Sequence, residues 1–121
     1  MALVLLITSL LSGVVAFLGF LGLAGKLPPN HFAGIRTPCT LQSAENWYAV
    51  HRAGGPYLVL LSVAALAAGL AFVPFALAGM LADPLIASIV AAQGVLLIAG
   101  VFSAWRIGAA RARSHLESRH T

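Results

Sequence analysis

Residues 57–80 read YLVLLSVAALAAGLAFVPFALAGM and contain no charged side chain. A helix rises about 1.5 Å per residue, so a stretch of this length crosses the roughly 30 Å hydrocarbon core of a bilayer. Two stretches of the same character flank it, at residues 2–24 and 85–105. Together they predict an all-α integral membrane protein with three transmembrane helices.

The composition agrees with this class, because 60% of the 121 residues are apolar and only 8% are charged. No repeat or linker divides the chain, so we expect a single membrane domain over residues 1–121. The first stretch has no basic residue before Lys26. It is therefore expected to be a true span and not a cleaved secretory signal, which would begin with positive charge.

Charge placement predicts the orientation, since lysine and arginine near span ends stay on the cytoplasmic side. All seven basic residues lie in the first connection, residues 26–55, or in the C-terminal tail, residues 106–121. The second connection, residues 81–84, carries only Asp83, which with Pro84 suits a helix start. We therefore expect the N-terminus outside and the C-terminus inside.

Two functional classes are disfavoured by the distribution of polar residues. The formal net charge is +4, but the basic tail has no aromatic residues for base stacking, so no direct nucleic-acid binding is expected. Membrane lipids with anionic headgroups are the expected partners. The spans contain no Asp, Glu, Lys, Arg or His, which argues against an ion-coupled transporter. Gln93 is the one strongly polar residue there and is expected to bond a neighbouring helix.

The first connection divides into a turn and a predicted helix. Pro28 and Pro29 stop the first span before Asn30. Thr40 or Ser43 is the expected N-cap, and a Ser43 cap places Glu45 in the first helical turn. The segment containing Trp47 then reads as a short cytoplasmic interfacial helix with its aromatic rings at headgroup depth. Gly54, Gly55 and Pro56 are expected to end it.

The stretch GIRTP, residues 34–38, combines a glycine, an arginine fork and a hydroxyl. An anion is predicted between Arg36, Thr37 and the helix N-terminus near Thr40, with His51 or Arg52 closing the other end. The alternative is that Arg36 holds the loop by capping carbonyls or pairing with Glu45. The residues expected to shape the loop are Asn30, Gly34, Pro38, Ser43, Glu45 and Trp47.

Catalytic and metal chemistry find little support in the same segment. His31, Cys39, Glu45 and His51 match no zinc-binding spacing. A Cys39–His51 dyad is conceivable, but nothing in the sequence supports it. We expect neither an enzyme nor a metal or other cofactor. Glycines at positions 19, 22 and 25 leave a groove for another helix, expected within the chain, with a homo-oligomer as the alternative.

The first connection resembles the signature segment of the SdpI-like family of bacterial membrane proteins. The matching positions are Asn30, Gly34, Ile35, Arg36, Thr37, Pro38, Thr40, Leu41, Ser43, Glu45, Trp47, His51, Arg52 and Gly55. The resemblance implies a multi-pass protein of the bacterial inner membrane. It also implies an immunity or signal-transduction role, because the name-giving member protects its producer from a peptide toxin and holds a repressor at the membrane. That member has additional spans, whereas this chain has the three-span core.

Three functions follow as hypotheses. The first is a non-enzymatic immunity or signalling protein whose loop binds an anionic lipid headgroup or a partner protein. The second is a small accessory subunit of a larger membrane complex. The third is a lipid-phosphate-binding protein that transfers or modifies lipid. Possible partners are thus lipids, a membrane protein or a repressor, and a second copy of the chain.

Overall fold

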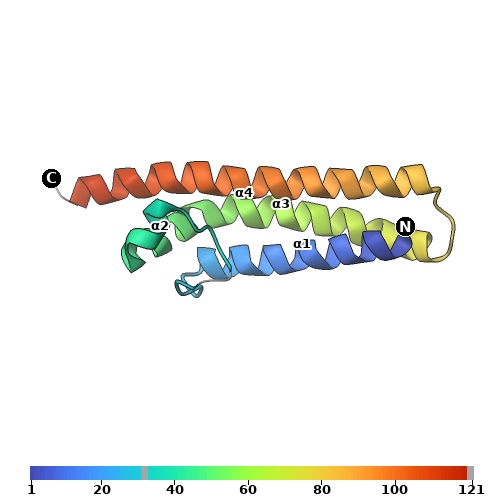
Figure 1. The fold of residues 1–121 in the computed structure, drawn as a ribbon, viewed down its shortest axis with the longest axis horizontal. Helices are drawn as coiled ribbons and strands as arrows, with labels where there is room; N and C mark the ends of the chain where they lie inside the picture. Colours follow the sequence, from blue (N-terminus) through green and yellow to red (C-terminus); the bar gives the residue numbers. More distant parts are fainter. Residues whose placement is uncertain (31–32, 120–121) are drawn as a thin grey trace.

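The computed structural model describes residues 1–30 and 33–119, without the side chains of Cys39, His115, Leu116, Ser118 and Arg119. Its helices are α1 (Ala2–Leu23), α2 (Pro38–Gln42), α3 (Ala44–Leu77) and α4 (Asp83–Arg119). Helices α1, α3 and α4 lie alongside one another (Figure 1), and each is long and apolar enough to cross a membrane. The described residues contain no strand, so the predicted all-α membrane class is confirmed.

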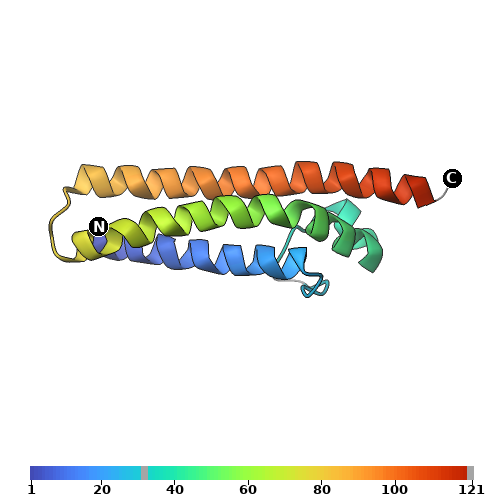
Figure 2. The same cartoon turned by 180° about the vertical axis from the view of Figure 1, so that it is seen from behind.

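The two basic segments lie at the same end of the bundle. The N-terminus and the α3–α4 turn are at one end, and the first connection and the C-terminal part of α4 are at the other (Figures 1 and 2). An odd number of antiparallel helices produces this pairing. It matches the placement that the charge pattern predicts.

Helix α3 is continuous from Ala44 to Leu77, so the predicted helix end at Gly54, Gly55 and Pro56 is wrong. The two glycines allow α3 to pack closely against its neighbours and do not end the helix. A Cβ on Gly54 would overlap the backbone carbonyl oxygen of Ala104 in α4, and one on Gly55 would lie 2.9 Å from the backbone nitrogen of Leu23 in α1. Pro56 is exposed, and proline is tolerated inside membrane helices.

The predicted interfacial helix is therefore divided between two elements. The first connection does contain a short helix, α2, but most residues assigned to the interfacial helix form the first turns of α3. At 34 residues, α3 is about 51 Å long and exceeds the hydrocarbon core by several turns. Its polar N-terminal part, residues 44–56, thus extends beyond the apolar span.

Helix α4 also runs past its predicted span, through the basic tail to Arg119. Its start at Asp83 is within one residue of the expected cap. Ala104, Gly108 and Ala112, four residues apart, are buried. A Cβ on Gly108 would lie 2.6 Å from the carbonyl oxygen of Val50 in α3. This small-residue stripe explains why the tail continues as a packed helix.

Gln93 joins all three long helices at the centre of the bundle and is 1% exposed. Its side-chain oxygen accepts a hydrogen bond from Thr8 Oγ1 at 2.6 Å. Its side-chain nitrogen donates to Ser9 Oγ at 3.1 Å and to the carbonyl oxygen of Ala65 at 3.0 Å. The predicted role of Gln93 in helix association is confirmed.

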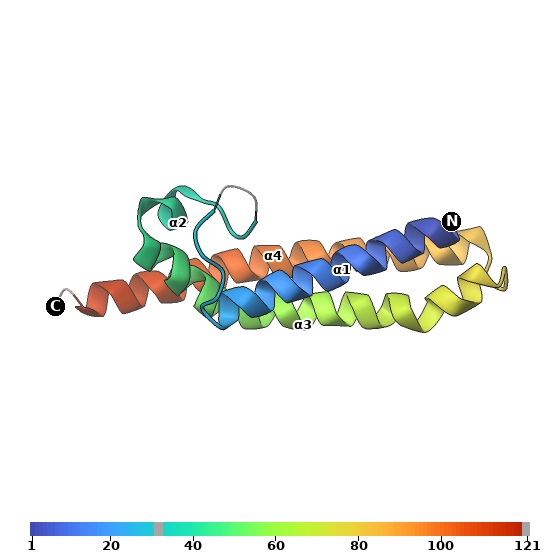
Figure 3. The same ribbon diagram turned by 90° about the horizontal axis from the view of Figure 1, so that it is seen from below.

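The glycine face of α1 packs against α3 within the chain. A Cβ on Gly19 would meet Val59 at 3.1 Å, and one on Gly22 would meet His51 at 3.1 Å. The expected intramolecular use of this groove is therefore observed. Figure 3 shows α3 bending in its last turns, the part that contains Pro74.

Candidate functional site

The first connection folds as a compact unit on the end of the bundle (Figure 3). We call residues 33–52, which contain α2 and the start of α3, the cap. Before it, the Asn30 side chain donates a hydrogen bond to the Pro28 carbonyl at 2.9 Å and accepts one from the Ala33 amide at 2.7 Å. Both hydrogen bonds are local, joining Asn30 to residues within three positions of it.

Thr37 and Thr40 form a capping box at the start of α2. Thr37 Oγ1 accepts from the Thr40 amide at 3.3 Å, and Thr40 Oγ1 accepts from the Thr37 amide at 2.8 Å. Pro38 occupies the first helical position, where a missing N–H costs nothing. The cap at Thr37 was missed, although Pro38 after a threonine is a recognised helix-start pattern. Both hydroxyls predicted to bind an anion therefore take part in capping.

Ser43 is the N-cap of α3, one of the two residues predicted for that position. Its side chain accepts a hydrogen bond from the Asn46 amide at 3.0 Å. Glu45 lies in the first turn of this helix, where a negative charge is favourable. The break between α2 and α3 at Ser43 lets the chain change direction above the bundle.

Trp47 attaches the cap to Leu27, in the segment that follows α1. Its side chain is fully buried, and Nε1 donates to the Leu27 carbonyl oxygen at 2.9 Å. Its ring stacks on the His51 imidazole with centroids 4.3 Å apart. The residue thus anchors the cap from inside, in contrast to the membrane-surface position expected from sequence.

His51 in α3 is 5% exposed, and both of its ring nitrogens make hydrogen bonds within the cap. Nε2 accepts from the Ile35 amide at 2.8 Å, so this nitrogen carries no proton. Nδ1 lies 2.7 Å from the Trp47 carbonyl oxygen and donates to it. The hydrogen bonds therefore describe a neutral imidazole that holds Ile35 in place.

Gly34 allows the cap to pass close to this histidine. Its φ is +107°, and a Cβ there would lie 2.7 Å from His51 Nε2 and 3.0 Å from the Trp47 ring. The close backbone approach predicted for Gly34 is thus made to two buried rings. Thr40 Oγ1 donates to the Ile35 carbonyl at 2.8 Å, so Thr40 and His51 hold Ile35 from both sides.

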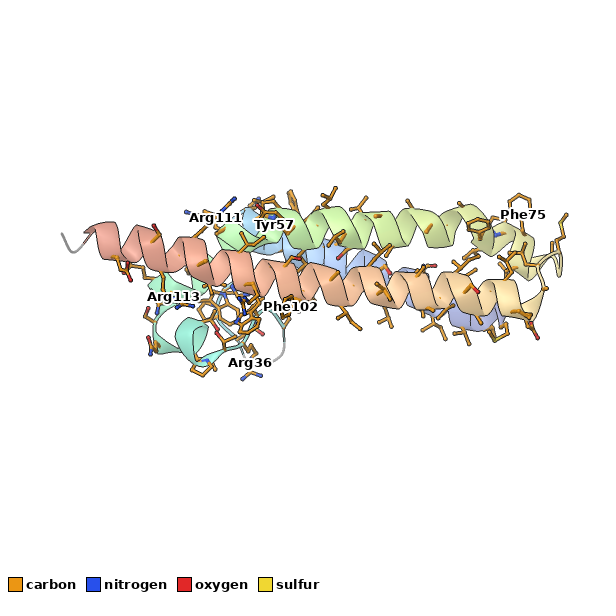
Figure 4. All side chains as sticks on the ribbon, turned by 90° about the horizontal axis from the view of Figure 1, so that it is seen from above. Arg36, Tyr57, Phe75, Phe102, Arg111 and Arg113 are labelled. Atoms are coloured by element: carbon orange, nitrogen blue, oxygen red, sulfur yellow. The ribbon has the colours of Figure 1, made fainter. Side chains whose placement is uncertain are left out.

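The two predicted anion-binding arginines lie in different grooves. Arg36 is exposed and lies in a groove of about 560 Å³ between the cap and α4. We call it the Arg36 groove; its other lining residues are Gly34, Ile35, Thr37, Leu97, Ile98, Val101, Phe102 and Trp105. Arg52 is also exposed, in a separate groove between α3 and α4 that includes Arg111. Figure 4 shows Arg36 and Arg111 on opposite sides of α4.

Two further arginines near these grooves were not singled out from sequence. The Arg106 guanidinium lies 5.9 Å from the ring centroids of both Phe102 and Trp105. The Arg111 guanidinium lies 5.6 Å from the Tyr57 ring centroid. Arginine four residues after an aromatic residue on one helix predicts the contact of Arg106 with Phe102. The contact of Arg111 with Tyr57 joins two helices and needs the fold.

The SdpI/YfhL protein family model matches residues 26–106, which include the cap, α3 and most of α4. The chain belongs to the SdpI/YfhL protein family. The match begins at the end of α1, so the family pattern includes the cap together with the two helices that carry it. No curated protein and no solved structure matches the chain significantly. Family membership and three apolar helices fit a membrane protein of the immunity type.

Proposed function

We propose that this SdpI/YfhL family member is a non-enzymatic protein of the bacterial inner membrane with an immunity or signalling role. Its cap binds an anionic group, carried by a lipid or a partner protein, at the cytoplasmic surface. The N-terminus would lie outside, and the cap and the C-terminal part of α4 inside. The positive-inside rule supports this orientation.

The observation that carries the proposal is an ordered, hydrogen-bonded cap that presents the Arg36 side chain at its surface. Thr37, Thr40 and His51 bond the backbone of the cap itself. The side chain of Arg36 is exposed at the rim of the groove between the cap and α4. A loop that only joined two spans would need neither a buried Trp–His pair nor a capping box. The order of the cap gives Arg36 a defined position relative to α4.

Arginine at this position suits a phosphate or carboxylate. The guanidinium presents a planar fork that binds either group through two parallel hydrogen bonds. The backbone of Ile35, next in sequence, is held at both its amide and its carbonyl. Less conformational freedom is then lost when an anion binds.

The proposal is tested by native mass spectrometry of the protein purified from bacterial membranes in a mild detergent. We expect a bound anionic molecule that is retained by Arg113→Ala and lost from Arg36→Ala. Arg113 is the matched control because it is exposed on α4 and lies outside the Arg36 groove. Circular dichroism and the yield of membrane protein verify that both variants fold.

The mass of the retained species separates the candidate functions. A phospholipid identifies a lipid headgroup as the anion, and a stoichiometric protein identifies an accessory-subunit role. Either species would need to depend on Arg36. Retention of the same species by Arg36→Ala would contradict the proposal.

A further inference from the structure

The Arg36 groove has an apolar part and a cationic part, which complement the acyl chains and the anionic headgroup of a membrane lipid. Its long wall is a stripe of α4 formed by Leu97, Ile98, Val101, Phe102 and Trp105. Ile98 is 72% exposed and Phe102 is 56% exposed, so these side chains face outward from the bundle. The other wall is the cap, which brings Arg36 and Thr37 against one end of the stripe. The groove is therefore apolar along α4 and cationic at the cap.

The cationic end is reinforced by α4 itself. Arg106 lies over both Phe102 and Trp105, the last two aromatic residues of the stripe. The Arg106 guanidinium thus lies beside two aromatic residues that line the Arg36 groove, while Arg106 itself lines the neighbouring groove that shares Trp105. Figure 4 shows Arg36 and Phe102 on the same side of the molecule, away from Arg111 and Tyr57.

The position of the groove along α4 matches the depth of a lipid. Residues 97–105 are the last part of the apolar stretch, and Arg106 is the first charged residue after it. Tryptophan and arginine at such a boundary mark headgroup depth. An acyl chain alongside Ile98 and Val101 would therefore lie in the hydrocarbon, with its phosphate level with Arg36 and Arg106.

We propose that the Arg36 groove is a binding site for an anionic glycerophospholipid, with the phosphate at Arg36, one acyl chain along α4, and Arg106 adding positive charge from beside Phe102 and Trp105. This inference rests on the proposed function and narrows it, because it assigns the anion to a lipid and adds Arg106 and the α4 stripe to the site. Charge selects the headgroup, and the concave apolar wall selects a molecule with a tail. Neither wall alone binds such a ligand selectively.

The test titrates delipidated protein in detergent with phosphatidylglycerol, and with phosphatidylcholine of the same acyl chains, followed by native mass spectrometry. Glycerol phosphate, which has the headgroup phosphate without a tail, serves as a competitor. The groove variant is Ile98→Trp, which places a bulky ring on the apolar wall. Its matched control is Leu60→Trp, since Leu60 is 67% exposed on α3 and outside the Arg36 groove.

We expect the wild type to prefer phosphatidylglycerol over phosphatidylcholine, and glycerol phosphate to compete poorly. Arg36→Ala and Arg106→Ala should each weaken phosphatidylglycerol binding by ~10-fold, the effect of losing about 1.4 kcal/mol. Ile98→Trp should weaken it as well, whereas Leu60→Trp should match the wild type.

Three results would overturn the inference. Unchanged phosphatidylglycerol binding by Ile98→Trp would place the lipid elsewhere. If glycerol phosphate displaced phosphatidylglycerol as well as free lipid does, the site would bind the headgroup and not the tail. The proposed function would then stand. A lipid-free dimer that Ile98→Trp dissociates would assign the α4 stripe to a second copy. If Arg36→Ala bound every tested anion as tightly as the wild type, the proposed function itself would be contradicted.

Discussion

At the scale of single residues, the cap is organised around the backbone of Ile35. Its amide donates to His51 Nε2 and its carbonyl accepts from Thr40 Oγ1. Both partners are buried, so each hydrogen bond is shielded from water, and its loss would leave a buried polar group unpaired. The next residue along the chain is Arg36. The buried contacts of the cap therefore fix the backbone from which the Arg36 side chain extends.

Gly34→Ala tests this arrangement with a single methyl group. The φ of +107° strains any residue with a Cβ, and the added atom would lie 2.7 Å from His51 Nε2. Backbone strain of this kind costs about 1–3 kcal/mol, and the overlap with two buried rings adds to it. We expect a loss in the free energy of unfolding of about 3 kcal/mol, measured by chemical denaturation in detergent micelles.

Gly79→Ala is the matched control, because Gly79 also has a positive φ, of +74°, but a Cβ there meets nothing within 4 Å. It should cost only the left-handed strain, about 1 kcal/mol. Equal destabilisation by the two variants would show that the contacts of Gly34 with His51 and Trp47 contribute nothing.

At the scale of elements, the same glycine pattern can end a helix or allow two helices to pack closely. The Gly54-Gly55-Pro56 run reads as a helix end, yet α3 continues through it because Gly54 contacts α4 and Gly55 contacts α1. The apolar stretches themselves were predicted correctly, since length and hydropathy decide them without reference to neighbours. A glycine in a turn and a glycine at a helix crossing look alike in sequence. Only the packed partner distinguishes them.

The site was predicted less completely for a similar reason. Ser43, Glu45 and Asn30 act locally, so their roles follow from neighbouring residues in the chain. Trp47 and His51 pair with Leu27 and Ile35, which are 20 and 16 positions away. No local pattern indicates such contacts, and an aromatic residue beside a histidine reads equally well as an interfacial anchor. The stripe from Ala104 to Ala112 was the overlooked sequence signal for the helical tail.

Gly54→Ala should separate α3 from α4, because the new methyl group would overlap the Ala104 carbonyl. Overpacking of this kind costs about 1–3 kcal/mol. Gly94→Ala, in α4 with nothing within 4 Å of its Cβ, should instead stabilise the helix by about 0.5–1 kcal/mol. Thermal unfolding in micelles measures both, and a stabilised Gly54→Ala variant would be inconsistent with the close crossing.

At the scale of the whole molecule, one end of the bundle is basic and the other has no basic side chain. The cap and the extended parts of α3 and α4 gather the arginines beyond the apolar spans, whereas the opposite turn carries only Asp83. This asymmetry predicts that the cap and the tail lie in the cytoplasm.

Cysteine labelling in intact cells tests the orientation. In a Cys39→Ser background, Met80→Cys should react with a membrane-impermeant maleimide added outside, because Met80 is 70% exposed at the α3–α4 turn. Ser114→Cys, exposed on the C-terminal part of α4, should react only after the membrane is permeabilised. The reverse pattern would invert the topology and place the cap outside.

Anion recognition by Arg36 is tested most directly by the affinity of Arg36→Lys for phosphatidylglycerol, compared with that of the wild type in the same detergent. Lysine keeps the positive charge but lacks the bidentate fork. We expect a folded variant with binding weakened by roughly 5-fold, between the wild type and Arg36→Ala. Affinity equal to that of the wild type would contradict recognition of an anion by the Arg36 fork.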